Sequence, residues 1–318
     1  MVADGANGLQ LLDVYKLSLI AENPTIMLNG ESGKRMAFNY CVCFIDLLGQ
    51  RNAAQGQGLL PHISSEAEDE AFQKVLSNNI GGILQLQQDV EELKEVLSPD
   101  PNSPFRQELS DEERTTWDEI QFESVKTQYW SDGFVKFVCL GDQENKYPAK
   151  GVFELYCTAG YFCLLGLVRR RPVRGAIDIA WASEIRPGEL YGPAIVRAYE
   201  LESEVAQYPR IVIGQEAVRF LEAHKSNPGD ELANRVNRSF AQKCLDLLAQ
   251  DDDGYWIVHY LGDAFRQAVT HTHHDNLYQK ARTFVVQQLE EHKRLRNSKL
   301  AFRYTQLLAY FDAYSSSV

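Results

Sequence analysis

The fold of this chain depends most on the segment Ala37-Phe38-Asn39-Tyr40-Cys41-Val42-Cys43-Phe44-Ile45-Asp46-Leu47-Leu48-Gly49. Both sets of residues that alternate along this segment are nearly all apolar, which is typical of a strand that is covered on both faces. The strand ends in Asp46, and burying a carboxylate without a partner is costly. Asp46 is therefore interpreted either as a ligand of a metal ion or as the cap of a following helix.

The composition indicates a soluble protein that does not bind nucleic acid or anionic membranes non-specifically. The chain has 318 residues, with 44 acidic and 32 basic side chains and a net charge of -12. Such a charge repels polyanions in general, although a metal-bound anionic substrate remains compatible with it. The length allows one large domain or two small ones.

The sequence predicts no membrane span and no secretory signal. The most apolar stretch, residues 151–168, contains Glu154 and is followed by three arginines, which favours a buried helix. Six cysteines lie in apolar segments without CxxC spacing, as expected for reduced core cysteines. We therefore expect a cytoplasmic protein.

The order of predicted strands and helices favours an α+β domain. Its sheet is expected to be mostly antiparallel, with helices on one face. Two strands, 122–130 and 133–140, are separated by Ser131 and Asp132 alone, as in a tight hairpin. We predict an N-terminal arm (1–35), the α+β domain (36–225) and a helical C-terminal extension packed on it (226–318).

Asp132 is the second carboxylate of interest. An Asp-Gly turn is a common hairpin device, so a purely structural role is the simpler interpretation. If the hairpin pairs with the first strand, however, Asp46 and Asp132 converge at one end of the sheet. Two carboxylates beside each other favour a divalent cation between them, as in sites that transfer nucleotidyl groups.

Four segments together resemble the class III nucleotidyl cyclase domain. They are Phe44 to Gly49, Ser131 to Gly133, Arg174 to Ile177 and Gly192 to Glu202, in the family's order and approximate spacing. The Gly-Pro-Ala helix start and the Tyr-Pro-Arg-Ile segment are most similar to the bacterial pyrimidine cyclases of Pycsar antiphage systems. The resemblance covers about residues 36–225 and implies a ferredoxin-like fold.

The resemblance implies a metal site and a substrate site. Asp46 and Asp132 would bind two divalent cations, Mn²⁺ or Mg²⁺, with the Leu47 carbonyl as a further ligand. The triphosphate would lie over the turn after the first strand, so that the substrate-binding residues there are Phe44, Leu47, Leu48, Gly49 and Gln50. No other cofactor is implied.

Base recognition is carried over by position to Lys126 and Glu189. A donor and an acceptor suit uridine or cytidine equally, so the pair does not decide the base. Lys126 is otherwise an exposed strand lysine, and Glu189 a turn carboxylate. Tyr199 either lines the base pocket or is a core or interface aromatic residue.

The chain departs from the purine cyclases at two positions. An Asn and an Arg of the family's helix are replaced here by Val196 and Glu200. Arg197 is the nearest replacement for the catalytic arginine, and Arg174 and Arg210 are further candidates. The alternative is a degenerate module that binds a nucleotide or a partner without turnover.

The function implied is conversion of UTP to 3′,5′-cyclic UMP and diphosphate, with CTP to cyclic CMP as the alternative. By the same resemblance the protein is a homodimer, whose metal aspartates and base-reading residues come from different protomers. The product would be a second messenger in antiviral defence that activates a separate effector protein. No nucleic acid and no membrane are expected as partners.

Overall fold

The structure is a computed structural model of the chain. It describes residues 37–48, 59–81, 84, 85, 88, 104–119, 125–130, 133–141, 147–269 and 276–314. The predicted N-terminal arm lies outside these residues, as do Gly49, Gln50 and Asp132.

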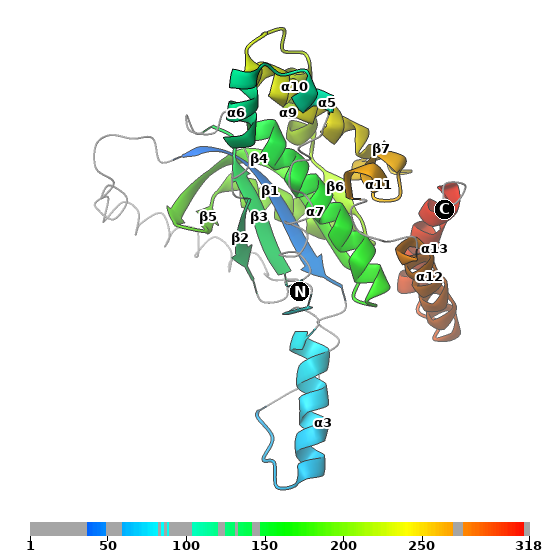
Figure 1. Cartoon of the computed structure of the whole chain (residues 1–318). Coiled ribbons are helices and arrows are strands. Elements are labelled where there is room, and N and C mark those ends of the chain that lie inside the picture. The colour runs from blue at the N-terminus through cyan, green and yellow to red at the C-terminus, as the bar shows by residue number, and fades with distance from the viewer. Residues whose placement is uncertain are drawn as a thin grey trace, which may run out of the picture. The chain divides into compact units, whose positions relative to one another are not determined.

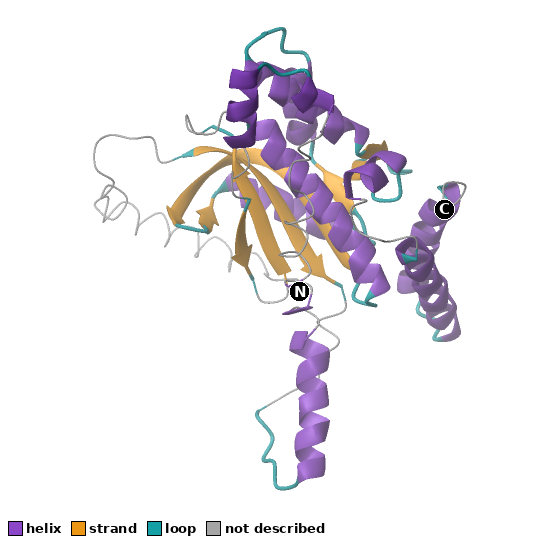
Figure 2. Ribbon diagram, viewed as in Figure 1, coloured by secondary structure: helices purple, strands orange, loops and turns teal. Residues whose placement is uncertain are grey.

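The described residues form an α+β fold around one mixed, mostly antiparallel sheet (Figures 1 and 2). The strand order is β2-β3-β1-β4-β6-β8-β7, and β5 pairs with β4. Among the described pairs, β4 and β6 alone run parallel. The predicted α+β class and the mostly antiparallel sheet are therefore confirmed. The strands are β1 (Phe38–Leu47), β2 (Lys126–Tyr129), β3 (Gly133–Cys139), β4 (Val173–Arg186), β5 (Glu189–Tyr191), β6 (Ile211–Ile213), β7 (Leu248–Gln250) and β8 (Trp256–Val258).

The first strand occupies the middle of the sheet, between β3 and β4. Tyr40, Val42 and Phe44 belong to a small core cluster on one face. Cys41, Cys43 and Ile45 belong to the large core cluster on the other face. Because side chains alternate along a strand, this division covers β1 on both faces, as the sequence predicted.

Helices cover both faces of the sheet. The apolar helix α7 (Pro148–Val168) packs in the large core cluster, whereas α8 (Pro193–Glu200) packs Ala194, Ile195 and Ala198 into the small one. The prediction of helices on one face was wrong. Since β4 and β6 are parallel, the chain between them must cross the sheet, and α8 is part of that crossover.

The helix α8 starts where the chain passes very close to β4. Gly192 has a φ of 138°, and a Cβ there would lie 2.9 Å from the Ala182 Cα. Pro193 follows in the first turn, where its missing N–H has no helical partner to lose. The Gly-Pro pair in the sequence is thus explained by this close approach.

The helix α7 is long and apolar enough to cross a membrane, and most of it is buried inside the protein. Its core residues include Leu155, Phe162 and Leu167. Figure 1 shows α7 lying across the sheet. Packing in the protein core therefore accounts for its apolar composition.

The chain after residue 225 adds to the same sheet and core. Strands β7 and β8 extend the sheet beyond β6, and helices α12 and α13 share the large core cluster with α7. The boundary drawn at residue 225 stays a prediction. The helices of this region are α9 (Gln215–Lys225, which begins before the boundary), α10 (Leu232–Asp246), α11 (Asp263–Val269), α12 (Leu277–Arg294) and α13 (Ser298–Ala313).

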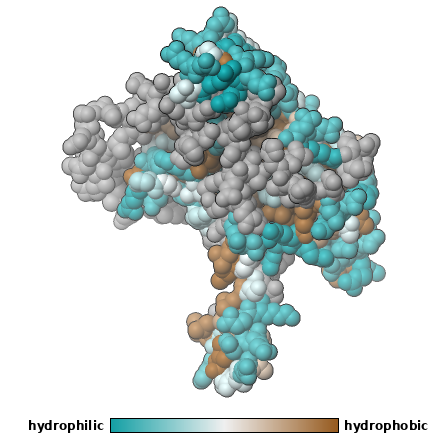
Figure 3. All heavy atoms as spheres, in the orientation of Figure 1, coloured by the Kyte–Doolittle hydropathy of each residue, from teal (hydrophilic) through white to brown (hydrophobic). Residues whose placement is uncertain are grey.

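The described residues between β1 and β2 include α3 (Glu66–Leu76), the π-helix η2 (Ser77–Gly81), α5 (Pro104–Gln107) and α6 (Asp111–Glu119). The Ser65 side chain caps α3 by accepting a hydrogen bond from the Glu68 N–H. Around α3, apolar side chains such as Leu60 and Ile80 are exposed. Figure 3 shows hydrophobic residues among hydrophilic ones over this segment.

Candidate functional site

Asp46 lies at the carboxyl end of β1, opposite Gly133 on β3 and Arg174 on β4. A Cβ on Gly133 would lie 2.5 Å from the Ile45 carbonyl oxygen, so the two strands are in close contact. The Trp130 N–H donates to the Gly133 carbonyl at 2.9 Å, which closes the predicted hairpin. Asp132 itself lies outside the described residues, and its covalent neighbour Gly133 pairs with Asp46.

Arg174, in register with Asp46, forms two ion pairs. The Arg174 Nη2 lies 3.7 Å from Asp46 Oδ2, and the Arg174 Nε lies 2.5 Å from Glu202 Oε1. The Glu202 side chain is 2% exposed, whereas that of Asp46 is 25% exposed. Arg174 thus stabilises two carboxylates, of which Asp46 is the more exposed to solvent.

Aromatic residues lie next to this carboxylate. The Phe44 ring has its centroid 5.4 Å from that of Tyr199 on α8 and 5.9 Å from that of Trp130. The rings of Trp130 and Tyr199 are about half exposed. After Asp46, Leu47 is buried and the Leu48 N–H donates to the Pro172 carbonyl at 2.9 Å. Gly49 and Gln50, also predicted to bind substrate, lie outside the described residues.

Lys126 begins β2 and Glu189 begins β5, which pair with β3 and β4 respectively. Lys126 Nζ donates to both carboxylate oxygens of Glu184, at 2.8 and 2.7 Å. Glu189 lies 3.7 Å from an Arg186 nitrogen. Lys126 pairs with Phe137, and Phe137 pairs with Val42 on β1. Val42 is four residues before Asp46, so Lys126 lies about 13 Å from Asp46 along the strand direction.

Arg197 is bound to a different carboxylate. Its Nε and Nη2 donate to Asp178 Oδ2 at 2.9 and 2.8 Å. Asp178 is four residues beyond Arg174 on β4, about 13 Å further along the strand. Arg174, and not Arg197, is therefore the arginine that the structure brings to Asp46 among the candidates.

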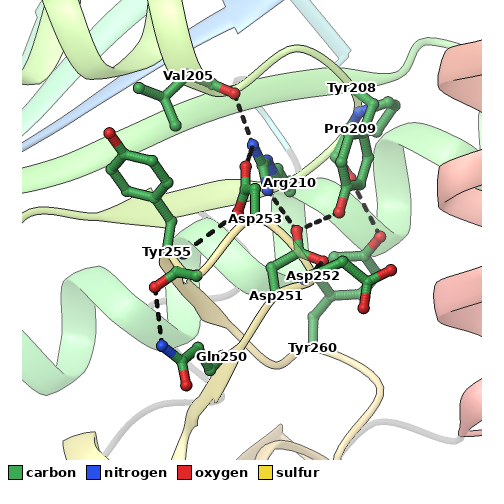
Figure 4. A network of polar contacts seen from close by, with 11 residues as sticks. Val205, Tyr208, Pro209, Arg210, Gln250, Asp251, Asp252, Asp253, Tyr255 and Tyr260 are labelled. Carbon is green, nitrogen blue, oxygen red and sulfur yellow. Dashed lines mark hydrogen bonds and ion pairs between the residues drawn. The ribbon is translucent and has the colours of Figure 1, made fainter.

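Arg210 belongs to a separate network at the β7–β8 turn (Figure 4). Its Nη2 donates to the Val205 carbonyl at 2.7 Å and to Asp253 at 2.6 Å, and its Nη1 donates to Asp251. Tyr208 also donates to Asp251, and burial together with this contact raises the pKa of Tyr208. All these groups fix the turn to the start of β6, which is a structural role.

The described residues contain no cluster of three or more His, Cys, Asp or Glu side chains that could hold a metal ion. A site would therefore need Asp46 together with residues outside the described part, such as Asp132. The carboxylate of Asp46 suits Mg²⁺ or Mn²⁺, which prefer oxygen ligands, and it is partly exposed. Arg174 is shared by Asp46 and Glu202, so these three groups keep an excess of negative charge, which suits a divalent cation.

The partners that sequence reasoning missed include Asp178 of Arg197, Glu184 of Lys126 and Glu202 of Arg174. Asp178 carries the same signal as Asp46, because it interrupts the apolar run Ala176-Ile177-Asp178-Ile179. A carboxylate in such a run needs a cation, and Arg197 provides it. Glu184 and Glu202 give no comparable signal, since their partners come from distant parts of the chain.

No protein-family model, no curated protein and no solved structure matches this chain.

Proposed function

We propose that this protein is a nucleotidyl cyclase that converts UTP to 3′,5′-cyclic UMP and diphosphate, with CTP as the alternative substrate. The observation that carries the proposal is the partly exposed Asp46 at the end of a central strand. It lies opposite the residue that follows Asp132 and beside Arg174. The ferredoxin-like cyclase fold is part of the same proposal.

In this proposal Asp46, Asp132 and the Leu47 carbonyl would hold two divalent cations. Bound there, the cations would lower the pKa of the ribose 3′-hydroxyl and stabilise negative charge on the phosphates. The 3′-oxygen attacks the α-phosphorus, the bond to the β-phosphate oxygen breaks, and diphosphate leaves while the hydroxyl proton goes to water. Arg174 would hold the Asp46 carboxylate in place, and Phe44 and Tyr199 would provide an apolar wall.

A homodimer would complete the site. Within one chain Lys126 lies far from Asp46 along the strands, so a base read by Lys126 and Glu189 calls for a second copy. Exposed apolar side chains on the α8 side of the sheet, namely Trp130, Val196 and Tyr199, favour such an interface. The cyclic product would activate a separate effector protein in antiviral defence.

The second candidate function is a nucleotide-binding module without turnover. It is favoured by one observation: Arg197, expected to replace the catalytic arginine, is bound to Asp178. The two functions differ in whether any nucleoside triphosphate is consumed.

The test is to incubate the full chain with each of the four nucleoside triphosphates and Mn²⁺ and to measure diphosphate release. We expect release with UTP or CTP, and its loss in Asp46→Ala and Asp132→Ala. Asp252→Asn, a change at an exposed turn carboxylate, is the matched control. Nucleotide binding without any product would reject the cyclase in favour of the binding module.

A further inference from the structure

A cavity of about 880 Å³ opens where β6 ends, and it contains neither Asp46 nor Lys126. Its lining comes from α8, the π-helix η4 (Leu201–Val205), the start of α9 and the β7–β8 turn. Cavities of this volume accommodate small organic molecules. Apart from Arg197, it holds none of the residues assigned above to substrate or metal.

The ion pair between Asp178 and Arg197 closes one side of the cavity. Asp178, which is buried, accepts from Arg197 at 2.8 and 2.9 Å and from the Ala217 N–H at 3.3 Å. A Cβ on Gly214 would lie 2.1 Å from the Asp178 Cγ, so no space remains behind this carboxylate. The ion pair contributes little net charge to the cavity.

Three further carboxylates give the cavity its charge. Glu200, Glu204 and Glu222 line it, and none of them makes a side-chain ion pair within the described residues. Arg219, the other cation of the lining, lies 2.6 Å from Glu216. The cavity therefore carries an excess of negative charge.

Two aromatic rings share the same lining. Tyr255 and Trp256 are 42% and 40% exposed, although they stand in and beside the buried strand β8. Figure 4 shows the Tyr255 ring on the side of the turn that faces Val205, another lining residue. Aromatic faces combined with carboxylates are the surroundings that bind organic cations.

The segment α8–η4 connects this cavity to the site at Asp46. Glu200, Leu201 and Glu204 line the cavity, whereas Tyr199 contacts Phe44 and Glu202 pairs with Arg174. Cavity-lining residues and residues that contact the Asp46 site thus alternate along the chain between positions 199 and 204. A ligand that orders this segment in the cavity would therefore also order the groups around Asp46.

We propose that the cavity binds a small organic cation of the quaternary ammonium class, and that binding orders residues 193–205. The binding itself does not depend on the proposed cyclase activity. An effect on turnover would rest on that function, so the tests below use no turnover.

Choline is the probe, and 3,3-dimethylbutan-1-ol, its neutral isostere, is the matched ligand. Calorimetric titration of the full chain at constant ionic strength is expected to show saturable binding of choline and none of the alcohol. Glu204→Gln/Glu222→Gln and Tyr255→Ala are each expected to weaken choline binding about fivefold or more. Glu231→Gln, at an exposed carboxylate outside the cavity, is expected to leave it unchanged.

Hydrogen exchange tests the coupling. Saturating choline is expected to slow amide exchange in residues 193–205 and not in α12. Equal binding of the alcohol, or unchanged affinity in the double glutamine variant, would overturn the cation site. Tight choline binding with unaltered exchange in residues 193–205 would overturn the coupling. Neither result depends on whether the protein turns over a nucleotide.

Discussion

At the scale of single residues, the structure divides the candidate arginines by the carboxylates they meet. Arg174 lies between Asp46 and Glu202, Arg197 is bound to Asp178, and Arg210 is bound to the β7–β8 turn. From the sequence, Arg197 is the nearest replacement for the catalytic arginine, and Arg174 and Arg210 are further candidates. Their partners leave Arg174 as the candidate beside Asp46, whereas Arg197 and Arg210 each neutralise carboxylates elsewhere in the fold.

Arg197→Ala is expected to destabilise the protein because it leaves the buried Asp178 without its guanidinium partner. Arg197 is 43% exposed, so we expect about 2 kcal/mol, less than for a fully buried pair. The urea midpoint measures the change. Arg219→Ala, which removes an exposed pair with Glu216, is the control and is expected to change stability by less than about 0.5 kcal/mol. Equal effects of the two changes would contradict the assignment.

Gly133→Ala is expected to separate β3 from β1 next to Asp46. The new Cβ would lie 2.5 Å from the Ile45 carbonyl oxygen, and backbone must move to relieve the clash. We expect a loss of roughly 1–3 kcal/mol by denaturant unfolding. Gly81→Ala, whose Cβ would meet only the Ser77 side chain at ordinary contact distances, is the control. An unchanged midpoint for Gly133→Ala would show that the strands do not pair this closely.

At the scale of elements, strands and helices with a strong local pattern were predicted, whereas elements held by contacts far along the chain were not. Strand β1 and helix α7 were predicted because their apolar residues continue over the whole element. The predicted helical extension gave no bounds for α10, whose burial depends on packing against α7 and α9. The hairpin was predicted from Ser131-Asp132-Gly133. The partners Glu184 on β4 and Glu202 on η4 are far along the chain from Lys126 and Arg174, so the sequence does not encode either contact locally.

The contact between α13 and the end of β8 predicts a pH dependence. His259 Nδ1 lies 2.8 Å from the Tyr310 hydroxyl, and the Tyr314 ring is close by. Burial lowers the pKa of His259 below 6.5, while Asp263 raises it and Arg266 lowers it. The neutral form is thus favoured in the folded protein. Its contribution to stability is complete above about pH 6.5 and is lost as the pH falls toward the lower folded pKa.

Unfolding free energies between pH 7.5 and 5 measure this effect. The native protein is expected to lose stability over that range, and His259→Gln to lose less. A smaller slope should persist in the variant, because burial also lowers the pKa of His224. An identical slope in both proteins would contradict the role of His259.

At the scale of the whole molecule, the C-terminal helices share one core with the sheet. Leu307 on α13 is fully buried in the same cluster as Tyr260 and Phe265. Leu307→Ala is therefore expected to reduce the unfolding free energy by about 2–5 kcal/mol. Leu295→Ala, at a 57% exposed position, is the control and should have little effect on thermal unfolding. A separate unfolding transition for the C-terminal helices would contradict a shared core.

In the proposed function, Asp46 serves a nucleotide and not the fold alone. The most direct measurement compares diphosphate release from UTP and CTP, with Mn²⁺, by the native chain and by Asp46→Asn, which keeps the shape of the side chain. The proposed function predicts turnover by the native protein and a loss of about a hundredfold or more in the variant, with unfolding midpoints that stay close. Equal turnover by the two proteins, or no turnover of either nucleotide by the native chain, would contradict it.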